Sequence, residues 1–379
     1  MKYKIALLFF LSTYLITCLN AGVLNLGMTG AVKSKVKELD KKVKESKVYI
    51  PEYTSLNTEN LPASRILDVP TRKQLLGFCY IESFAMLMAF LDNSITIEEV
   101  VAYSGSGAIL HYDSYIKSFS PTVPYPNSPI YYELSNYGAH YILGSAGGYG
   151  WSQLYNNAYA KITYTNETDA MKYLKAALNS GRPSQVYIDL GYLPTLTNVK
   201  YPGVLPGAGS HWILVTGYDT DGIYLNETYT NEGSTNQYKN FEVPVSEFLQ
   251  AWQKGADVSR GESGPYWMMF IEEKTVAELT GKKSGTDILT MQKQFSANNA
   301  TTIENNLNSD FSKTIWNEVA RIKEAFGNYI IQVGFTEAGN LYKSLSDDYK
   351  ACDTMTVDGK KTQLNNVIKQ KEVEARTKY

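Results

Sequence analysis

The sequence predicts an α+β protein followed by a helical carboxy-terminal region. Residues 79–91 form an apolar run without glycine or proline, which is typical of a buried helix. Short segments rich in β-branched and aromatic residues follow between residues 184 and 272. After residue 274 the composition shifts to Lys, Asn, Thr, Ser and Glu. A helical part that precedes strands joined by tight turns is typical of α+β domains.

The composition argues against several classes of protein. The 379-residue chain has 36 basic and 38 acidic side chains, so it lacks the positive charge that nucleic-acid binding requires. Three Cys and three His are too few for a zinc finger, a multi-His metal enzyme or a disulfide scaffold. We therefore expect no metal or organic cofactor. Hydrophobic residues make up 44% of the chain, which is enough for a packed core.

The first 21 residues have the pattern of an export signal. Two lysines precede an apolar run over residues 5–17, and Asn20-Ala21-Gly22 provides a cleavage site. The apolar run is shorter than the roughly 20 residues that a membrane-spanning helix needs. Leu15-Ile16-Thr17-Cys18 also resembles a bacterial lipobox, so lipid attachment at Cys18 is an alternative. We expect an exported protein of the bacterial periplasm, the cell envelope or the extracellular space.

Residues 22–65 are predicted to be a helical spacer. Four apolar residues recur at helical spacing among lysines and acids, which predicts an amphipathic helix over about residues 30–46. Prolines then mark an extended approach to the main domain. The apolar residues are Val32, Val36, Leu39 and Val43, and the prolines are Pro51, Pro62 and Pro70.

The main domain is predicted over residues 66–274. Residues 103–165 are rich in Gly, Ser, Pro and Tyr and are expected to form loops around one or two helices. A helix over 168–180 ends at Gly181. Strands are expected at 184–190, 212–218, 223–225 and 266–272, the second and third joined by a turn at residues 219–222.

Residues 275–379 are expected to form a helical module. Ile315, Val319, Ile322 and Phe326 are spaced for one face of a helix.

Cys79 is the first candidate catalytic residue. It lies where an extended segment gives way to the apolar helix. The free amides and positive dipole end at a helix start favour a thiolate, the form that acts as a nucleophile. A buried cysteine at a helix start is also a common structural feature, so the assignment requires a base elsewhere in the chain.

His211 is the candidate base. It begins an apolar strand after a glycine-rich loop, so its ring is able to project into a cleft. Asn226 and Glu227 follow on the returning strand, 15 and 16 positions later, and either could orient the imidazole. Strand alternation does not decide between them, because a one-residue difference in the hairpin would exchange their faces. Gln74, five positions before Cys79, is a candidate for stabilising an oxyanion together with the Cys79 amide.

Two segments resemble the papain-like cysteine peptidase superfamily, in particular its bacteriocin-processing (double-glycine leader) peptidase-like branch. These are Gly77-Phe-Cys-Tyr-Ile-Glu-Ser-Phe-Ala-Met-Leu and Ser210-His-Trp-Ile-Leu-Val-Thr-Gly-Tyr-Asp-Thr-Asp-Gly-Ile-Tyr-Leu-Asn-Glu227. Two further segments are similar to the amino-terminal domain of the butirosin-biosynthesis protein H family, which uses the same fold for acyl transfer. They are Tyr103-Ser-Gly-Ser-Gly-Ala-Ile-Leu and Gly181-Arg-Pro-Ser-Gln-Val-Tyr-Ile-Asp-Leu-Gly-Tyr-Leu-Pro194.

The resemblance covers about residues 70–273 and implies a papain-like fold with Cys79 as nucleophile and His211 as general base. Glu227 falls where the family usually has Asp, with Asn226 just before it, and Gln74 lies one residue closer to the Cys than the usual oxyanion Gln.

The expected function is hydrolysis of peptide or other acyl substrates by an exported thiol enzyme. Acyl transfer by the same fold is one alternative, and a catalytically silent envelope-binding module is another. A disulfide between Cys79 and Cys352 would mask the nucleophile in an oxidising compartment.

Overall fold

The computed structural model describes twelve parts of the chain. The described residues are 50–73, 79–107, 111–113, 118–120, 134–147, 155–207, 209–228, 236–258, 264–296, 299–306, 314 and 316–379. The expected export signal, the helix over 30–46 and Gln74 lie outside these residues.

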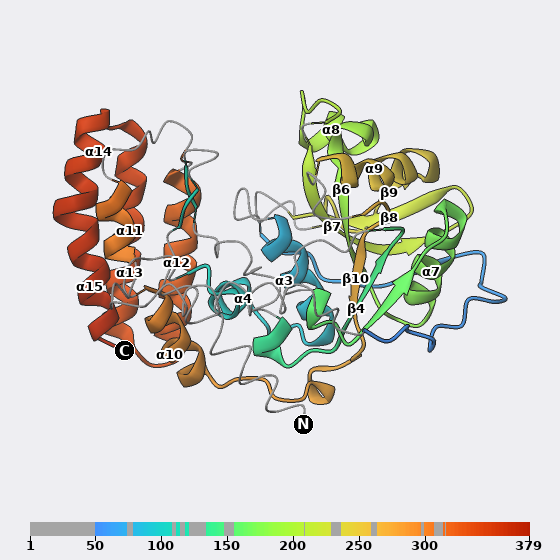
Figure 1. Ribbon diagram of the computed structural model, residues 1–379, viewed down its shortest axis with the longest axis horizontal. Helices are drawn as coiled ribbons and strands as arrows, with labels where there is room; N and C mark the ends of the chain where they lie inside the picture. The colour runs from blue at the N-terminus through green and yellow to red at the C-terminus, as the bar shows by residue number, and fades with distance from the viewer. Residues whose placement is uncertain are drawn as a thin grey trace, which may run out of the picture. The chain divides into compact units, whose positions relative to one another are not determined.

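A mixed sheet forms the centre of the domain (Figure 1). Its strand order is β5-β4-β10-β6-β7-β8-β9, and the short strand β1 pairs with β7. All neighbours are antiparallel except the parallel pair β4 and β5. In the order given, the strands are Ala160–Thr163, Tyr141–Ser145, Met268–Ile271, Ser184–Asp189, Ser210–Tyr218, Gly222–Asn226 and Phe241–Pro244, with β1 at Arg65–Ile66. A separate pair comprises β2 (His111–Asp113) and β3 (Ser118–Ser120).

The strands expected at 184–190, 212–218, 223–225 and 266–272 are confirmed by β6, β7, β8 and β10. The turn that joins β7 to β8 is confirmed as well, since the Asp219 carboxylate accepts hydrogen bonds from the amides of Asp221 and Gly222. The expectation of loops across residues 103–165 is wrong for the strands β2, β3, β4 and β5. Gly144 suggests a turn in the sequence, but it lies within β4. A Cβ at this position would overlap the Tyr164 ring, so close packing requires glycine here.

Part of the predicted spacer packs on this sheet. Glu52 forms a bridge with Lys161 of β5, and Tyr53 is buried. The Tyr53 hydroxyl donates to Glu272, which also binds Arg182 at 3.0 Å.

Helix α3 (Cys79–Leu91) confirms the predicted helix, and every residue from Ile81 to Ala89 is buried. It packs on β7, and α9 (Val245–Val258) packs on β6 (Figure 1). Helix α7 (Glu167–Asn179) is the helix expected over 168–180, and Asn166 caps its start. Two further helices of the main domain are α4 (Ile97–Ser104) and α8 (Pro194–Lys200).

The carboxy-terminal region is helical, as expected. Its helices are α10 (Gly285–Ser296), α11 (Asn299–Asn306), α12 (Trp316–Gln332), α13 (Thr336–Ala351), α14 (Val357–Gln363) and α15 (Lys369–Thr377), with a π-helical turn at Leu364–Ile368 between the last two. Val319, Ile322 and Phe326 are buried on α12, as their spacing predicts, while Ile315 is outside the described residues. A Cβ on Gly327 would lie 2.7 Å from the Gly339 carbonyl, so α12 and α13 cross at small residues.

Candidate active site

Cys79 is the first residue of α3 and a half-buried free thiol. Its carbonyl accepts a hydrogen bond of 2.6 Å from Ser83 Oγ, and Ser83 Oγ in turn accepts from Gln185 Nε2 of β6 at 2.7 Å. Gln185 Nε2 also donates to the Tyr80 carbonyl at 3.0 Å. This chain of hydrogen bonds fixes the first turn of α3 against the sheet. The thiol is therefore presented from a helix start, where a negative charge is favoured.

His211 is the second residue of β7 and is buried. The buried carboxylate of Asp189 organises the loop before it, since its oxygens accept from the amides of Gly191 at 3.0 Å and Gly207 at 2.6 Å. Gly209 passes so close to this carboxylate that a Cβ would lie 2.8 Å from Asp189 Oδ1. The loop therefore holds the start of β7, and with it the imidazole, in one place.

The His211 imidazole interacts with both Glu227 and Cys79. Its Nε2 is 3.3 Å from Glu227 Oε1, an ion-pair contact whose N–H direction is not aligned for a hydrogen bond. Burial alone would lower the pKa of His211. The Glu227 carboxylate, and a charge interaction and side-chain hydrogen bond with Cys79, raise that pKa to about 10. The imidazole is therefore in its protonated form at neutral pH.

Glu227 is buried beside two cations. Burial would raise the pKa of this carboxyl, but His211 and Lys200 lower it to about 2. Lys200 Nζ lies 2.8 Å from Glu227 Oε2, and the Tyr201 hydroxyl donates to the same oxygen. The carboxylate thus presents its other oxygen, Oε1, to the imidazole.

Asn226 does not meet the imidazole. Its Nδ2 donates to the Val69 carbonyl at 2.7 Å, and its Oδ1 accepts from the Asn240 amide at 2.7 Å. The structure therefore brings Cys79, His211 and Glu227 together and places Asn226 in a backbone-binding role.

A β-bulge explains which of the two neighbours faces His211. Gly217 pairs with Tyr224, whereas Leu214 pairs with Asn226, so the register shifts by one residue at Thr216. Asn226 shares the face of Leu214, and Glu227 has the alternation of His211. Without the bulge Asn226 would oppose residue 215 and take the His211 face instead.

Sequence reasoning missed Lys200, Tyr201, Ser83 and Gln185. Gln185 had a partial signal, because a polar amide directly precedes the apolar run Val186-Tyr-Ile188 of a predicted strand; the structure buries it fully. No pattern pointed to Lys200 or Tyr201, whose contacts depend on where α8 ends relative to β8.

Cys352, the other cysteine in the described part of the chain, is a free thiol, so the disulfide with Cys79 that would mask the nucleophile is not formed in this structure. Cys352 is fully buried at the end of α13, and burial raises its pKa to about 12. A thiol in this state is unreactive at neutral pH.

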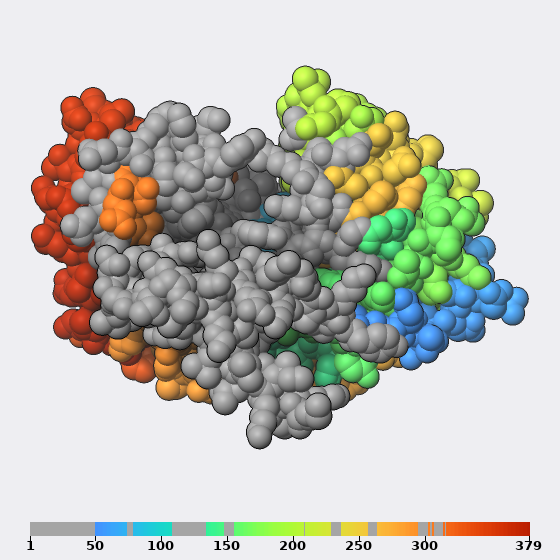
Figure 2. Space-filling model, viewed as in Figure 1, coloured from blue at the N-terminus to red at the C-terminus, as the bar shows by residue number. Residues whose placement is uncertain are grey.

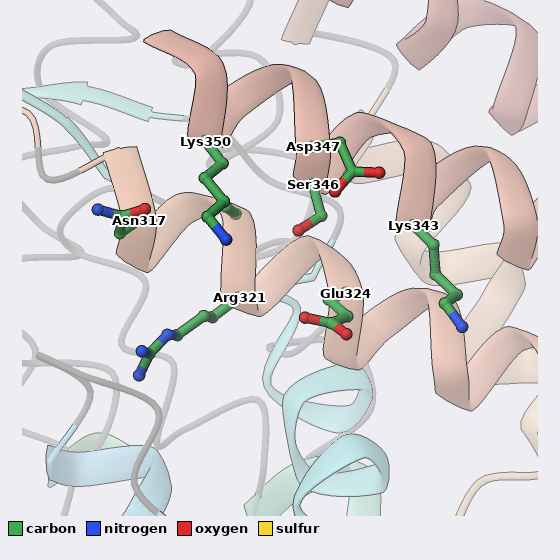
Figure 3. Close-up of a pocket in the computed structure, with 8 residues that line it drawn as sticks. Asn317, Arg321, Glu324, Lys343, Ser346, Asp347 and Lys350 are labelled. Carbon is green, nitrogen blue, oxygen red and sulfur yellow. The ribbon is translucent and has the colours of Figure 1, made fainter. Parts of the chain in front are cut away.

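A polar hollow of about 320 Å³ lies between α12 and α13 (Figure 3). Arg321, Glu324, Lys343 and Lys350 are among the residues that line it, with neither thiol nor imidazole. It offers no nucleophile of the kind found at Cys79.

Within the described ranges, no three Asp, Glu, His or Cys side chains converge as metal ligands, and no helix has the length and hydropathy to cross a membrane.

Cys79 at the start of α3, His211 on β7 and Glu227 directly after β8 lie together in an α+β fold of the papain-like class. Residues 66–259 match the model of the Peptidase_C39 like family, and the chain belongs to this family. The matched region includes Cys79, His211 and Glu227. A crystal structure of a C39-like peptidase from Bacillus anthracis is similar, with 12% identity, a TM-score of 0.33 and coverage of 56% of this chain and 100% of that one. Comparison with curated proteins finds no match.

Proposed function

We propose that the protein is an exported thiol hydrolase that cleaves peptide-like or other acyl bonds through Cys79, His211 and Glu227. The observation that supports this most directly is the convergence of these three side chains, with His211 in contact with both others. The export signal over residues 1–21, with lipid attachment at Cys18 as its alternative, is part of the proposal.

The proposed reaction begins with the Cys79 thiolate and the His211 imidazolium. The sulfur attacks the carbonyl carbon, and the oxyanion that forms is stabilised by the Cys79 backbone amide at the helix start. The imidazolium gives its proton to the leaving group as the carbon–leaving-group bond breaks, which leaves a thioester on Cys79. Neutral His211 then takes a proton from water as the water oxygen bonds to the thioester carbon. The second oxyanion collapses, the carbon–sulfur bond breaks, and the acid product leaves with the Cys79 thiolate and the His211 imidazolium regenerated.

Glu227 keeps the imidazole oriented through both steps and stabilises its protonated form. It fills the role that an amide or carboxylate has in the Cys-His enzymes. Asn226 is not proposed for this role because both ends of its amide are bound to backbone groups.

Acylation of the purified mature protein by an activated thioester tests the proposal. Intact-protein and peptide mass spectrometry should locate the acyl group on Cys79, with turnover that is lost in Cys79→Ala and His211→Ala and kept in the matched control Cys352→Ala. Addition of an amine during turnover distinguishes hydrolysis from acyl transfer. If Cys79 is not acylated, or is acylated equally in His211→Ala, the catalytic proposal is wrong and the silent binding module is favoured.

A further inference from the structure

We infer that Lys200, together with Tyr201, is a positioning residue that fixes Glu227 so that one carboxylate oxygen faces His211. The inference rests on the proposed function, and it extends the site to two residues that lie at the end of α8.

Lys200 is enclosed although it ends a surface helix. Its side chain is 4% exposed, whereas its neighbour Val199 is 55% exposed. Figure 2 shows α8 and the residues after it, in yellow-green, at the surface of the molecule. The Lys200 ammonium group is therefore directed inward, like the buried residues Leu196 and Thr197 of α8, and not toward solvent like Val199. A buried lysine requires charged and hydrogen-bonded partners.

All the donors of Lys200 have partners within the site. Nζ donates to Glu227 Oε2 at 2.8 Å, to the Thr228 carbonyl at 2.7 Å and to Thr228 Oγ1 at 3.1 Å. The rings of Tyr201 and Tyr238 lie 5.0 Å and 4.9 Å from Nζ and shield it from water. Since an ammonium group has three protons, Lys200 is fully engaged at this position.

Tyr201 is the second residue that binds the Glu227 carboxylate. Its hydroxyl donates to the Oε2 that Lys200 binds, and its ring contacts the His211 ring edge to face at 5.5 Å. The pKa of Tyr201 is raised by burial and by the Glu227 charge, so the hydroxyl keeps its proton and remains a donor. Two consecutive residues thus hold one oxygen of Glu227, and the other remains for the imidazole.

The charges around Glu227 come from three elements. His211 faces it from β7, Lys200 faces it from α8, and Glu82 of α3 lies one hydrogen bond away through Thr228 Oγ1 at 3.5 Å. Cys79 of α3 interacts with the same imidazole through a side-chain hydrogen bond. Removal of the Lys200 cation would leave a buried cluster with more negative charge. Such a change disfavours the anionic forms of the site and favours the imidazolium.

The test is the pH dependence of Cys79 alkylation by iodoacetamide in the full-length mature protein. In Lys200→Met we expect both limbs of the profile to move to higher pH, by roughly one to two units. Lys200→Arg should keep the wild-type limbs because it retains the charge. Tyr201→Phe removes one donor and keeps the ring, so we expect a smaller movement in the same direction. Lys172→Met, which breaks the exposed pair of Lys172 with Glu59, is the matched control and should change nothing.

A purely structural role gives a different result. If Lys200→Met and Tyr201→Phe reduce alkylation by the same factor at every pH, with unmoved limbs, the inference is overturned while the proposed function stands. If Lys200→Met does not fold, the Tyr201→Phe profile alone decides. If wild-type Cys79 reacts as an ordinary thiol, the proposed function fails instead.

Discussion

Glu227 Oε1 lies 3.3 Å from His211 Nε2, while the adjacent Asn226 turns its amide to the Val69 carbonyl. The two residues occupy consecutive positions at the end of β8, and the bulge at Thr216 sets which one shares the alternation of His211. The charged neighbour therefore contacts the imidazole and the neutral one binds backbone.

Replacing Glu227 with Gln should slow turnover sharply, whereas replacing Asn226 should not. Glu227→Gln removes the anion that stabilises the imidazolium, and we expect a loss within the roughly 10²- to 10⁴-fold range of acid-base assistance. Asn226→Ala leaves two buried backbone groups without partners and should lower the free energy of unfolding by about 1–3 kcal/mol. Thioester turnover at equal amounts of folded protein, with urea unfolding, measures both. Equal activity losses in the two variants would contradict the assignment of Glu227.

Replacing Gly209, in the loop before His211, with Ala should slow the reaction of Cys79 by displacing His211. The added Cβ would meet Asp189 Oδ1 at 2.8 Å and the Gly191 amide at 2.9 Å, so the loop before His211 must move. We expect a lower melting temperature and slower alkylation of Cys79. Gly147→Ala is the control for glycine loss, since Gly147 does not have a positive φ and its added Cβ would make only an ordinary contact, 3.7 Å from Pro265 Cδ. An unchanged alkylation rate in Gly209→Ala would show that the loop does not position His211.

Glu318 should make stability depend on pH in a region distant in sequence from the catalytic candidates. Burial raises the pKa of this carboxyl from 4.5 to about 7, opposed by Arg321. Below pH 4.5 the group is protonated in both the folded and unfolded states. Its stabilising contribution is lost as the pH rises through 7, because the folded protein must then hold a poorly solvated charge. Glu318→Gln should therefore raise the melting temperature at pH 8 but not at pH 4. Glu324→Gln, an exposed change on the same helix, is the control, and an equal effect of Glu318→Gln at both pH values would contradict this explanation.

Lys323 and Glu372 form a buried ion pair in the carboxy-terminal helices. Nζ lies 2.7 Å from Glu372 Oε1, and the two side chains are 0% and 1% exposed. Lys323→Met leaves a buried carboxylate without its cation and should destabilise the protein by about 3–5 kcal/mol. The double variant Lys323→Met with Glu372→Leu should recover most of that loss in urea unfolding. A double variant no more stable than Lys323→Met would show that the pair does not determine the effect.

Local composition was sufficient to predict the helices and strands whose residues are nearly all buried. The middle of α3 and nearly all of β6, β7 and β8 are buried, so the apolar pattern and the fold agree. The strand β4 was missed because Gly144 is required for contact with Tyr164, a tertiary reason that a single sequence does not display.

The candidate site was predictable only where its residues stand at the start of a predictable helix or strand. Cys79 and His211 stand at the start of predictable elements, so their positions could be inferred. The choice between Asn226 and Glu227 depends on a bulge inside β7, and the contacts of Lys200 depend on where α8 ends. Both are properties of chain packing rather than of residue pattern.

The pairing of Cys79 with His211 is tested by the second-order rate of Cys79 alkylation from pH 4 to pH 11, in wild type and His211→Ala, both carrying Cys352→Ala. We predict that Cys79 reacts faster in wild type than in His211→Ala at every pH below 10, because the pKa of His211 is raised to about 10 and its imidazolium stabilises negative charge on the sulfur. A wild-type rate that rises only near the ordinary thiol pKa of about 8.5, and is unchanged in His211→Ala, would contradict this prediction.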